Sequence, residues 1–221
     1  MVVLATRCYV EGDARERTLA SLDALVGDAM GDLDVDWTIG VRDDGFPSVT
    51  VEGSDATVGR NLLREQWGEV TPHLQEGEVA VGTLEGWSEN GLELDAGQSV
   101  TVPPAGLGLG QGRPSQIRTR FGLVQHLPLR FVPGEPPRLA DAERDRLYDW
   151  RRGDGRVNVN SATRAAVRAT VNRAGHARDI VTVERLGLLE QSIVCAPGTD
   201  PPGLVAAIGE YLPSELLAVV T

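Results

Sequence analysis

The sequence contains no lysine, so all 21 of its basic residues are arginine. They are outnumbered by 32 acidic residues, and the formal net charge is −11. A carboxylate-rich surface keeps a protein hydrated and soluble, whereas arginine is more weakly hydrated than lysine and forms bidentate contacts. Together these features predict a protein from the cytoplasm of a halophile. They also give every arginine an ordinary explanation, because such an organism uses arginine in place of lysine.

Cysteine and long apolar runs are also scarce. The two cysteines, Cys8 and Cys195, lie far apart in apolar, strand-like segments, and neither belongs to a Cys-x-x-Cys pair. This pattern favours free, buried thiols and argues against a disulfide or a cysteine-based metal site. No apolar run reaches the roughly 18 residues that a membrane helix needs, and the N-terminus lacks the features of an export signal. We therefore expect a soluble, cytoplasmic protein with no membrane partner.

Three segments differ in charge and in residue pattern. A chain of 221 residues is long enough for two or three compact units. Residues 1–74 hold 14 acids and 6 arginines, residues 75–137 hold 7 and 4, and residues 138–221 hold 11 of each. The last third is therefore neutral in an otherwise acidic protein, which makes it the relatively basic part. From these shifts we expect domains at 1–72, 75–135 and 138–221.

The first segment has the pattern of an acidic α/β unit. A strand-like run (1–10) precedes helical spacing (11–30), two alternating strands around a turn, and a second helix that stops at Gly68. This βαββα order predicts a ferredoxin-like module. Its polar face carries five aspartates without the glycine and distal glutamate of a calcium loop, so we interpret them as a solvated surface: Asp32, Asp34, Asp36, Asp43 and Asp44.

The second segment replaces helices with short strands separated by glycine, and predicts a small β-barrel. Its glycine-rich run GLGLGQG (106–112) lacks the lysine and hydroxyl residue of a phosphate-binding loop, so we expect a flexible connection. The run VAVGTLEGWSENGLELDAG (79–97) resembles the RNA-binding barrel of the ribosomal protein S-one type, which is an OB fold. An SH3-like barrel is the alternative, because a fifth strand is not evident.

The barrel resemblance implies that RNA bases stack on aromatic side chains. That family carries aromatics on its second strand, where this chain has Leu92 and Leu94. The remaining candidates for stacking on bases are Trp87, Phe121 and His126, although each of these side chains also fits a core position. Arg118 and Arg120, on the short helix that starts at Pro114, complete this candidate surface.

The third segment begins after a proline-rich linker (133–137) with a charged helix over 139–152. Residues 156–221 then predict the order βαββαβ, with Ser161 as the cap of the first helix and Gly187 in the turn between two strands. This is a second ferredoxin-like module. The predicted fold class is therefore α+β, with two ferredoxin-like modules flanking a small OB-like or SH3-like barrel.

The run RVNVNSATRAAVRATVNRAGHARDIVTVERLGLLEQSIVC (156–195), together with the acidic start and the central barrel, resembles the archaeal domain-of-unknown-function family DUF2110. The resemblance covers nearly the whole chain. It implies an archaeal, and here haloarchaeal, cytoplasmic protein. It implies no enzymatic activity, because the family has none to carry over.

The arginine-rich stretch from Arg144 to Arg185 predicts a surface for an anionic partner, RNA above all. Guanidinium groups bind phosphates bidentately, and such short-range contacts persist in molar salt, where the Debye length is about 3 Å. The candidates flank a glycine loop, share one face of the following helix or follow its end: Arg151, Arg152, Arg156, Arg164, Arg168 and Arg178. The alternative is that arginines pair with local acids, Arg144 and Arg146 with Asp141, Asp145 and Asp149, and Arg178 and Arg185 with Asp179 and Glu184.

These observations predict a non-catalytic RNA-binding protein of the archaeal translation or RNA-handling machinery, without a cofactor or a metal. A protein-binding adaptor on a ribosome or RNA polymerase is the alternative. An enzyme would require His176 to meet Cys195 as a base–nucleophile pair, with Asp179 and Glu184 nearby. His73 and His126 lie in other segments, so a metal cluster would need long-range assembly.

Overall fold

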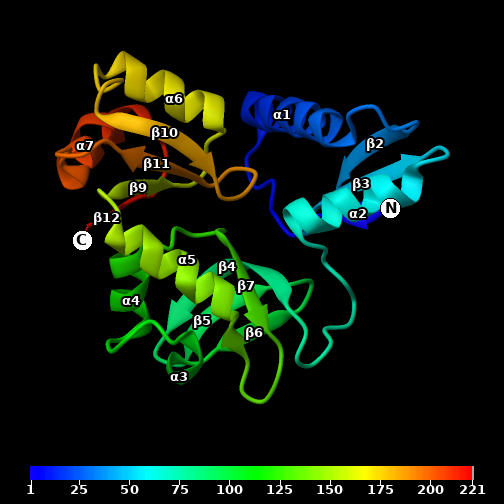
Figure 1. Ribbon diagram of the computed structural model, residues 1–221, viewed down its shortest axis with the longest axis horizontal. Coiled ribbons are helices and arrows are strands. Elements are labelled where there is room, and N and C mark those ends of the chain that lie inside the picture. The colour runs from blue at the N-terminus through cyan, green and yellow to red at the C-terminus, as the bar shows by residue number, and fades with distance from the viewer. Residues whose placement is uncertain (221) are drawn as a thin grey trace.

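The computed structural model describes residues 1–220 and has a mixed α+β fold with three antiparallel sheets (Figure 1). This confirms the predicted α+β class. The ferredoxin-like and OB-like assignments are finer than this and stay predictions.

The N-terminal sheet has the strand order β1-β3-β2 and packs against two helices. Alternation decides which face is buried: Trp37 and Ile39 pair with Val51 and Val49 on the helix side, whereas threonine, serine and acidic residues face away. The elements are β1 (Val2–Val3), α1 (Gly12–Met30), β2 (Asp36–Val41), β3 (Pro47–Glu52) and α2 (Ala56–Trp67).

The first strand is much shorter than predicted. We expected a strand over 1–10, but only Val2–Val3 joins the β1–β3 ladder, and Leu4 makes an isolated bridge to Glu69. Residues 5–10 leave the sheet and run toward the other two sheets, where side chains such as Arg7 and Tyr9 find their partners. A β-favouring run does not specify which backbone groups pair.

The central sheet has the strand order β6-β5-β4-β7-β8 and curls into a half-barrel. Its edge strands β6 and β8 do not pair with each other among the described residues, so the sheet is open. A fifth strand does exist, directly after the predicted linker, at the start of the segment assigned to the third domain. The strands are β4 (Ala80–Ser88), β5 (Gly91–Asp95), β6 (Ser99–Val102), β7 (Pro128–Val132) and β8 (Arg138–Leu139).

The glycine-rich run is not the flexible connection that we expected. It begins inside α3 (Pro104–Leu107) and ends shortly before α4 (Pro114–Phe121). Leu107 and Leu109 are 0% and 1% exposed and belong to the central core. Gly108 and Gly110 have φ angles of 63° and 81°, a conformation that glycine adopts easily and that turns both leucines inward.

The C-terminal sheet has the strand order β10-β11-β9-β12, with α6 and α7 packed against it. The observed cap of α6 is Thr163, whose hydroxyl accepts from the Ala166 N–H, and not Ser161 as predicted. The elements are β9 (Arg156–Val159), α6 (Arg164–Arg173), β10 (Ile180–Arg185), β11 (Gln191–Cys195), α7 (Pro201–Ile208), the 3-10 turn η1 (Gly209–Tyr211) and β12 (Leu216–Val219).

Two of the three cores are shared between segments of the chain. Helix α5 (Asp141–Arg152), which we had assigned to the C-terminal module, buries Leu147 and Trp150 in the central core. The β10–β11 hairpin reaches across to the N-terminal part of the chain (Figure 1), where Leu188 and Leu189 complete its core. The N-terminal and central cores therefore both include residues of the C-terminal segment, whereas the core of the C-terminal sheet is built from residues 157–216 alone.

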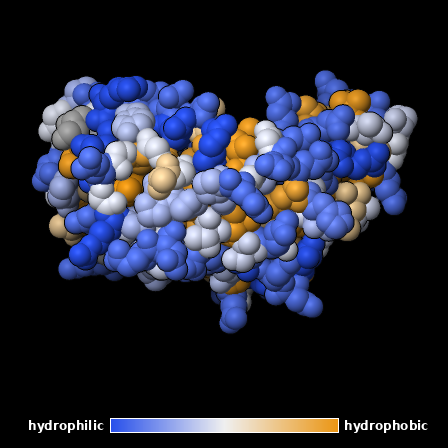
Figure 2. All heavy atoms as spheres, turned by 90° about the horizontal axis from the view of Figure 1, so that it is seen from below, coloured by the Kyte–Doolittle hydropathy of each residue, from blue (hydrophilic) through white to orange (hydrophobic). Residues whose placement is uncertain are grey.

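The surface is mainly hydrophilic. On the face shown in Figure 2, hydrophobic residues are scattered among hydrophilic ones. Among residues 1–220, no helix is both long and apolar enough to cross a membrane.

Candidate functional site

A groove of about 770 Å³ runs between α5 and the C-terminal sheet. Arg156 on β9 and Thr182 and Glu184 on β10 occupy the polar face of that sheet, because Val157 and Val183 point to the helices. Arg146 and Trp150 of α5 lie opposite. We call this space, with Arg164 and Arg185 at its side, the helix–sheet groove.

Arg164 and Arg185 are the unusual pair in this groove. No described carboxylate lies within ion-pair distance of either side chain, and the buried Nε of Arg164 has no hydrogen-bond partner. Burial, followed by the charge of Arg164, lowers the pKa of Arg185, and the charge of Asp28 partly opposes this. The two like charges are thus only partly compensated, which favours an anion beside them.

The other cations of the groove are already engaged. Arg156 lies 2.9 Å from Glu184 and donates to the Ser192 hydroxyl over 3.1 Å. Arg146 pairs with the fully buried Glu143. Both guanidinium groups lie about 5 Å from the ring of Trp150, at 5.0 Å and 4.9 Å, within cation–π range. These engaged side chains lie in the groove with Arg164 and Arg185.

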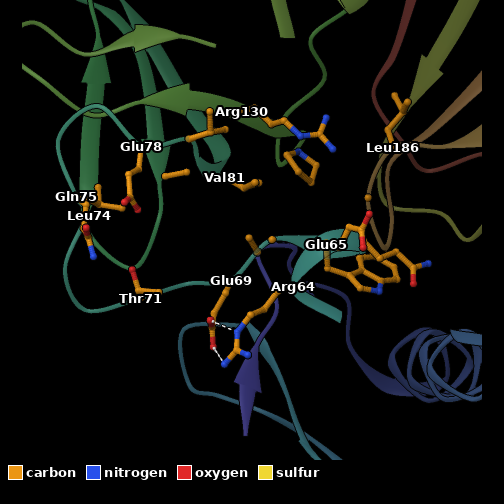
Figure 3. A pocket seen from close by; sticks show the side chains of 18 of the residues that line it. Arg64, Glu65, Glu69, Thr71, Leu74, Gln75, Glu78, Val81, Arg130 and Leu186 are labelled. Atoms are coloured by element: carbon orange, nitrogen blue, oxygen red, sulfur yellow. Dashed lines mark hydrogen bonds and ion pairs between the residues drawn. The ribbon is translucent and has the colours of Figure 1, made fainter. Parts of the chain in front are cut away.

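A second cavity, of about 820 Å³, continues from the groove and shares Arg146, Arg185 and Leu186 with it. We call it the junction pocket, because its walls come from the end of α2, from β4 and β7, and from the β10–β11 hairpin. Figure 3 shows Val81, Arg130 and Leu186 on different elements around it. Arg64 is neutralised by Glu69 at 2.6 Å.

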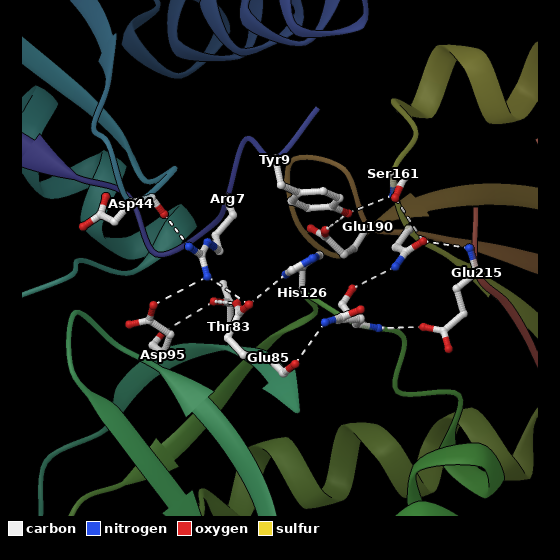
Figure 4. Close-up of polar contacts among 12 residues, drawn as sticks. Arg7, Tyr9, Asp44, Thr83, Glu85, Asp95, His126, Ser161, Glu190 and Glu215 are labelled. Carbon is white, nitrogen blue, oxygen red and sulfur yellow. Dashed lines mark hydrogen bonds and ion pairs between the residues drawn. The ribbon is translucent and has the colours of Figure 1, made fainter. Parts of the chain in front are cut away.

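A partly buried polar cluster connects the three segments of the chain (Figure 4). The Tyr9 hydroxyl donates to Glu190 over 2.7 Å and accepts from the Ser161 N–H over 2.8 Å. His126 stacks on Tyr9 at 3.9 Å and lies 3.1 Å from Glu85. Arg7 reaches Glu85 at 2.9 Å. We call these residues the central polar cluster.

The backbone is strained at this cluster. His126 and Ser161, with φ angles of 68° and 58°, are the non-glycine residues with positive φ in the described chain. Such conformations cost about 1–3 kcal/mol each and persist only where the surroundings impose them. Both residues contact Tyr9, so the packing of three segments around Tyr9 offsets this cost.

Two carboxyl groups of the cluster are shifted in opposite directions. Complete burial raises the pKa of Glu190 to about 8, and the charge of Glu85 adds to this. Burial also acts to raise the pKa of Glu85, but His126, then Thr83 and Arg7, outweigh it and lower the pKa to about 2. Glu190 is therefore protonated at neutral pH, and Glu85 is ionised.

The predicted arginines of the third segment are spread over several surfaces. Arg156 and Arg164 meet in the helix–sheet groove, whereas Arg168 and Arg178 are exposed elsewhere. Arg151 lies over the Phe121 ring at 5.8 Å.

The alternative of local acid pairs holds for part of α5. Arg144 pairs with Asp141 at 2.5 Å, whereas Arg146 pairs with Glu143 and not with Asp145 or Asp149. Arg152, which we predicted as an RNA contact, pairs with Asp149 at 2.9 Å. It does not hold for Arg178 or Arg185, because Asp179 lies against His176 and Glu184 against Arg156.

The predicted residues of the central segment are mostly used inside the molecule. Arg118 is buried, stacks 3.6 Å above Trp87 and pairs with Glu215 at the start of β12. His126 belongs to the central polar cluster. Arg120 lies against the glycine-rich run and lines a small surface hollow. These positions do not join the helix–sheet groove.

The residues proposed for an enzyme do not form a catalytic pair. His176 Nδ1 lies 2.6 Å from Asp179, and Cys195 is 1% exposed within the C-terminal core. No described residue forms a hydrogen bond to the Cys195 thiol, and burial raises its pKa, which keeps it unreactive. Within residues 1–220, no group of three or more His, Cys, Asp or Glu side chains is placed to hold a metal.

Sequence reasoning missed Arg185 as a site residue and the entire central polar cluster. Arg185 does not belong to a recognisable sequence motif, and its neighbour Glu184 suggested that the two side chains form an ordinary ion pair. Glu190 offered one signal, since it is a single carboxylate inside the apolar hairpin run LGLLEQSIV (186–194), where an acid is rarely buried without a role.

Three family models match consecutive parts of the chain. They are the DUF2110 N-terminal domain over residues 1–73, the DUF2110 central domain over 74–151 and the DUF2110 C-terminal domain over 154–220. No curated protein and no solved structure shows significant similarity to the chain. Since the three models together span almost every residue, the chain belongs to the DUF2110 family.

Proposed function

We propose that this protein binds RNA without catalysis, and that the helix–sheet groove is the contact surface. The observation that carries the proposal is the pair Arg164 and Arg185, two neighbouring cations with no carboxylate partner in a protein of net charge −11. A phosphate backbone supplies repeated negative charge at the spacing of such contacts. The acids that also line the groove are Asp145, Asp149 and Glu184, of which Glu184 pairs with Arg156.

The geometry of the groove favours RNA over a diffuse polyanion. Guanidinium groups form bidentate contacts with phosphate, and the engaged side chains of Arg146, Arg156 and Trp150 lie in the same groove. Such contacts keep their strength in high salt, because they depend on short distances and not on long-range attraction. The proposal therefore fits the salt-rich cytoplasm that the composition predicts.

The fold assignments are part of the same proposal. The βαββαβ order and the strand order β10-β11-β9-β12 support a ferredoxin-like C-terminal module, and the curled central sheet supports an OB-like one. Both folds present a sheet face to RNA in other proteins. Here the polar face of the C-terminal sheet borders the groove.

The test is the double variant Arg164→Gln/Arg185→Gln. Its affinity for a labelled, random-sequence single-stranded RNA should fall at least about tenfold, because two charge-assisted contacts are lost. Fluorescence anisotropy at fixed salt measures this. The control is Arg17→Gln, an exposed arginine of the acidic α1, which should leave the affinity unchanged.

Equal affinities for the double variant and the wild type, with both proteins folded by circular dichroism, would refute the groove as the site. Absence of RNA binding by the wild type at every salt concentration would refute RNA binding itself and favour the adaptor function.

A further inference from the structure

The outer edge of β2 is free. This strand lies at one side of the N-terminal sheet (Figure 1), and among residues 1–220 it pairs with β3 alone. The hydrogen bond from the Arg42 N–H to the Phe46 carbonyl, over 3.0 Å, fixes the phase of that ladder. Because hydrogen-bonded and non-hydrogen-bonded pairs alternate along an antiparallel ladder, the backbone N–H and C=O groups of Trp37, Ile39 and Val41 point outward, away from β3.

This edge lacks the features that usually keep other strands away. Between Asp36 and Arg42 the strand has no charged residue, no proline and no bulge. The side chains of Trp37, Ile39 and Val41 are only half-buried, so apolar surface lies beside the free backbone groups. The outer strand β10, by contrast, has an irregular register and two charged residues. Since edge strands are commonly protected by bulges and charges, the outer edge of β2 favours a partner strand.

A second copy of β2 matches this edge when the two strands run antiparallel and are centred on Ile39. Ile39 then faces Ile39 of the second copy, and Trp37 faces Val41, so every outward backbone group of the strand is paired. The charged ends match in the same register, because Asp36 of each copy lies opposite Arg42 of the other. Opposite charges at such cross-strand positions stabilise the pairing.

The neighbouring registers fit less well. A shift by two residues in one direction requires the Val35 N–H, which already donates to the Leu33 carbonyl over 3.0 Å. The same shift in the other direction sets Asp36 against Asp44 of the second copy, and like charges directly opposite each other are destabilising. In the central register Arg42 keeps Asp44, 2.8 Å away in its own chain, and has N–H donors left for a second carboxylate.

We propose that the outer edge of β2 joins two copies of this chain, whose N-terminal sheets combine into one continuous sheet around Ile39. A basic strand of another protein would satisfy Asp36 but would place like charge beside Arg42, so the opposite charges at the two ends favour a second copy. Dimerisation through β2 does not depend on the proposed RNA binding, since β2 contributes no residue to the helix–sheet groove.

The dimer should be weak and should form best in high salt. One pair of short strands buries less than the roughly 1,200 Å² of the smallest stable interfaces, so we expect a dissociation constant on the order of 100 µM. Each copy has a net charge of −11, and the resulting long-range repulsion is screened in about 1 M salt, where the Debye length is about 3 Å. The contact between Asp36 and Arg42 acts at shorter range and remains.

The experiment is sedimentation velocity of the full-length protein in about 1 M KCl, at concentrations from about tenfold below to tenfold above that dissociation constant. The wild type should change from monomer to dimer. Val41→Pro should remain a monomer, because proline removes an outward N–H. The ladder with β3 should persist in this variant, since Val41 faces Pro47 in a pair without hydrogen bonds. Circular dichroism checks that the variant is folded.

Exchanging the charges tests the register. Asp36→Arg alone sets arginine against arginine and Arg42→Asp alone sets aspartate against aspartate, so each variant should dimerise at least about fivefold more weakly than the wild type. An equal mixture of the two variants restores both opposite-charge contacts and has the same total charge as wild-type pairs, so dimers should form again. Glu16→Arg, at an exposed position on α1, is the control and should not weaken the dimer.

A wild type that stays monomeric at the highest concentration would overturn the proposal. So would a folded Val41→Pro variant that still dimerises, or a mixture of the charge variants that dimerises no better than its separate components. Weakened dimers of Asp36→Arg and of Arg42→Asp, with recovery in the mixture, would support the proposed register even if Val41→Pro does not fold. None of these measurements involves RNA, so the RNA-binding proposal stands or falls separately.

Discussion

Glu190 is the residue whose environment is most unlike water. Its side chain is 0% exposed at the base of the β10–β11 hairpin. One carboxyl oxygen accepts a hydrogen bond from the Tyr9 hydroxyl, and the other has no hydrogen-bond partner among the described residues. Gly187 is required opposite it, because a Cβ there would lie 2.2 Å from the Glu190 carboxylate. Keeping this carboxyl neutral is therefore a condition of the packed hairpin.

The stability of the protein should depend on pH through Glu190. The pKa of Glu190 is about 8 in the folded protein, compared with 4.5 for an unperturbed glutamate. Between these pH values the folded state retains a proton that the unfolded state releases. The free energy of unfolding should then fall as pH rises from about 4.5 to about 8, by at most roughly 1.4 kcal/mol per pH unit. Urea denaturation across this range measures the slope.

The Glu190→Gln variant should flatten that slope, because an amide cannot ionise but still accepts from Tyr9. Glu16→Gln, at an exposed position on α1, is the control and should reproduce the wild-type slope. Parallel curves for Glu190→Gln and the wild type would contradict the assignment.

Glu85 acts in the opposite direction: its pKa of about 2 predicts a loss of stability as pH falls from 4.5 toward 2.

At the scale of elements, α4 and β12 are joined by one buried arginine. Arg118 stacks on Trp87 and pairs with Glu215, whose other oxygen accepts from the Gln125 N–H over 2.8 Å. Asn158 on β9 adds a hydrogen bond to the Gly122 carbonyl over 2.8 Å. These contacts hold the C-terminal sheet against the central one. From the sequence alone, Arg118 was predicted to be an exposed cation.

Arg118→Ala should lower the free energy of unfolding by about 2 kcal/mol, because it leaves Glu215 without its charged donor and uncovers Trp87. Urea denaturation measures the loss. Arg152→Ala is the comparison, since Arg152 and Asp149 are 72% and 70% exposed, and should cost less than about 1 kcal/mol. Equal effects of the two substitutions would show that the buried contact has no special weight.

Elements with clear periodicity could be predicted from the sequence, whereas their partners could not. The helices around Leu22, Leu63 and Val167 and the strand pair around Ile39 and Val49 lie where their apolar spacing indicates. The spacing of Leu147 and Trp150 predicts a buried face for α5 but does not say which sheet covers it. The groove is invisible in the sequence for the same reason, since it joins Arg146, Arg164 and Arg185 through tertiary packing.

At the scale of the whole molecule, the three DUF2110 segments behave as one body. Leu188 and Leu189 fill the N-terminal core, Val81 packs with Val3 and Phe46, and Val219 belongs to the central core. Tyr9 adds polar contacts to Glu190 and Ser161. Segments that share buried surface lose it together, so their unfolding should be coupled.

Urea should therefore unfold the chain in a single transition. Tryptophan fluorescence follows the first two segments, which hold Trp37, Trp67, Trp87 and Trp150, and circular dichroism follows all three. The two midpoints should coincide. Leu189→Ala should shift both midpoints, by about 2–5 kcal/mol of stability, although residue 189 lies outside the segments with tryptophan. Separate midpoints, or a shift in one signal only, would show independent domains.

The inserted hairpin also has a consequence for biosynthesis. A ribosome delivers the chain from its N-terminus, so the first sheet and its helices emerge long before Leu188 and Leu189 exist to cover them. The nascent first segment must wait with an open apolar site, and its core closes only after the β10–β11 hairpin has left the ribosome. A complete N-terminal core thus shows that synthesis has passed Leu189.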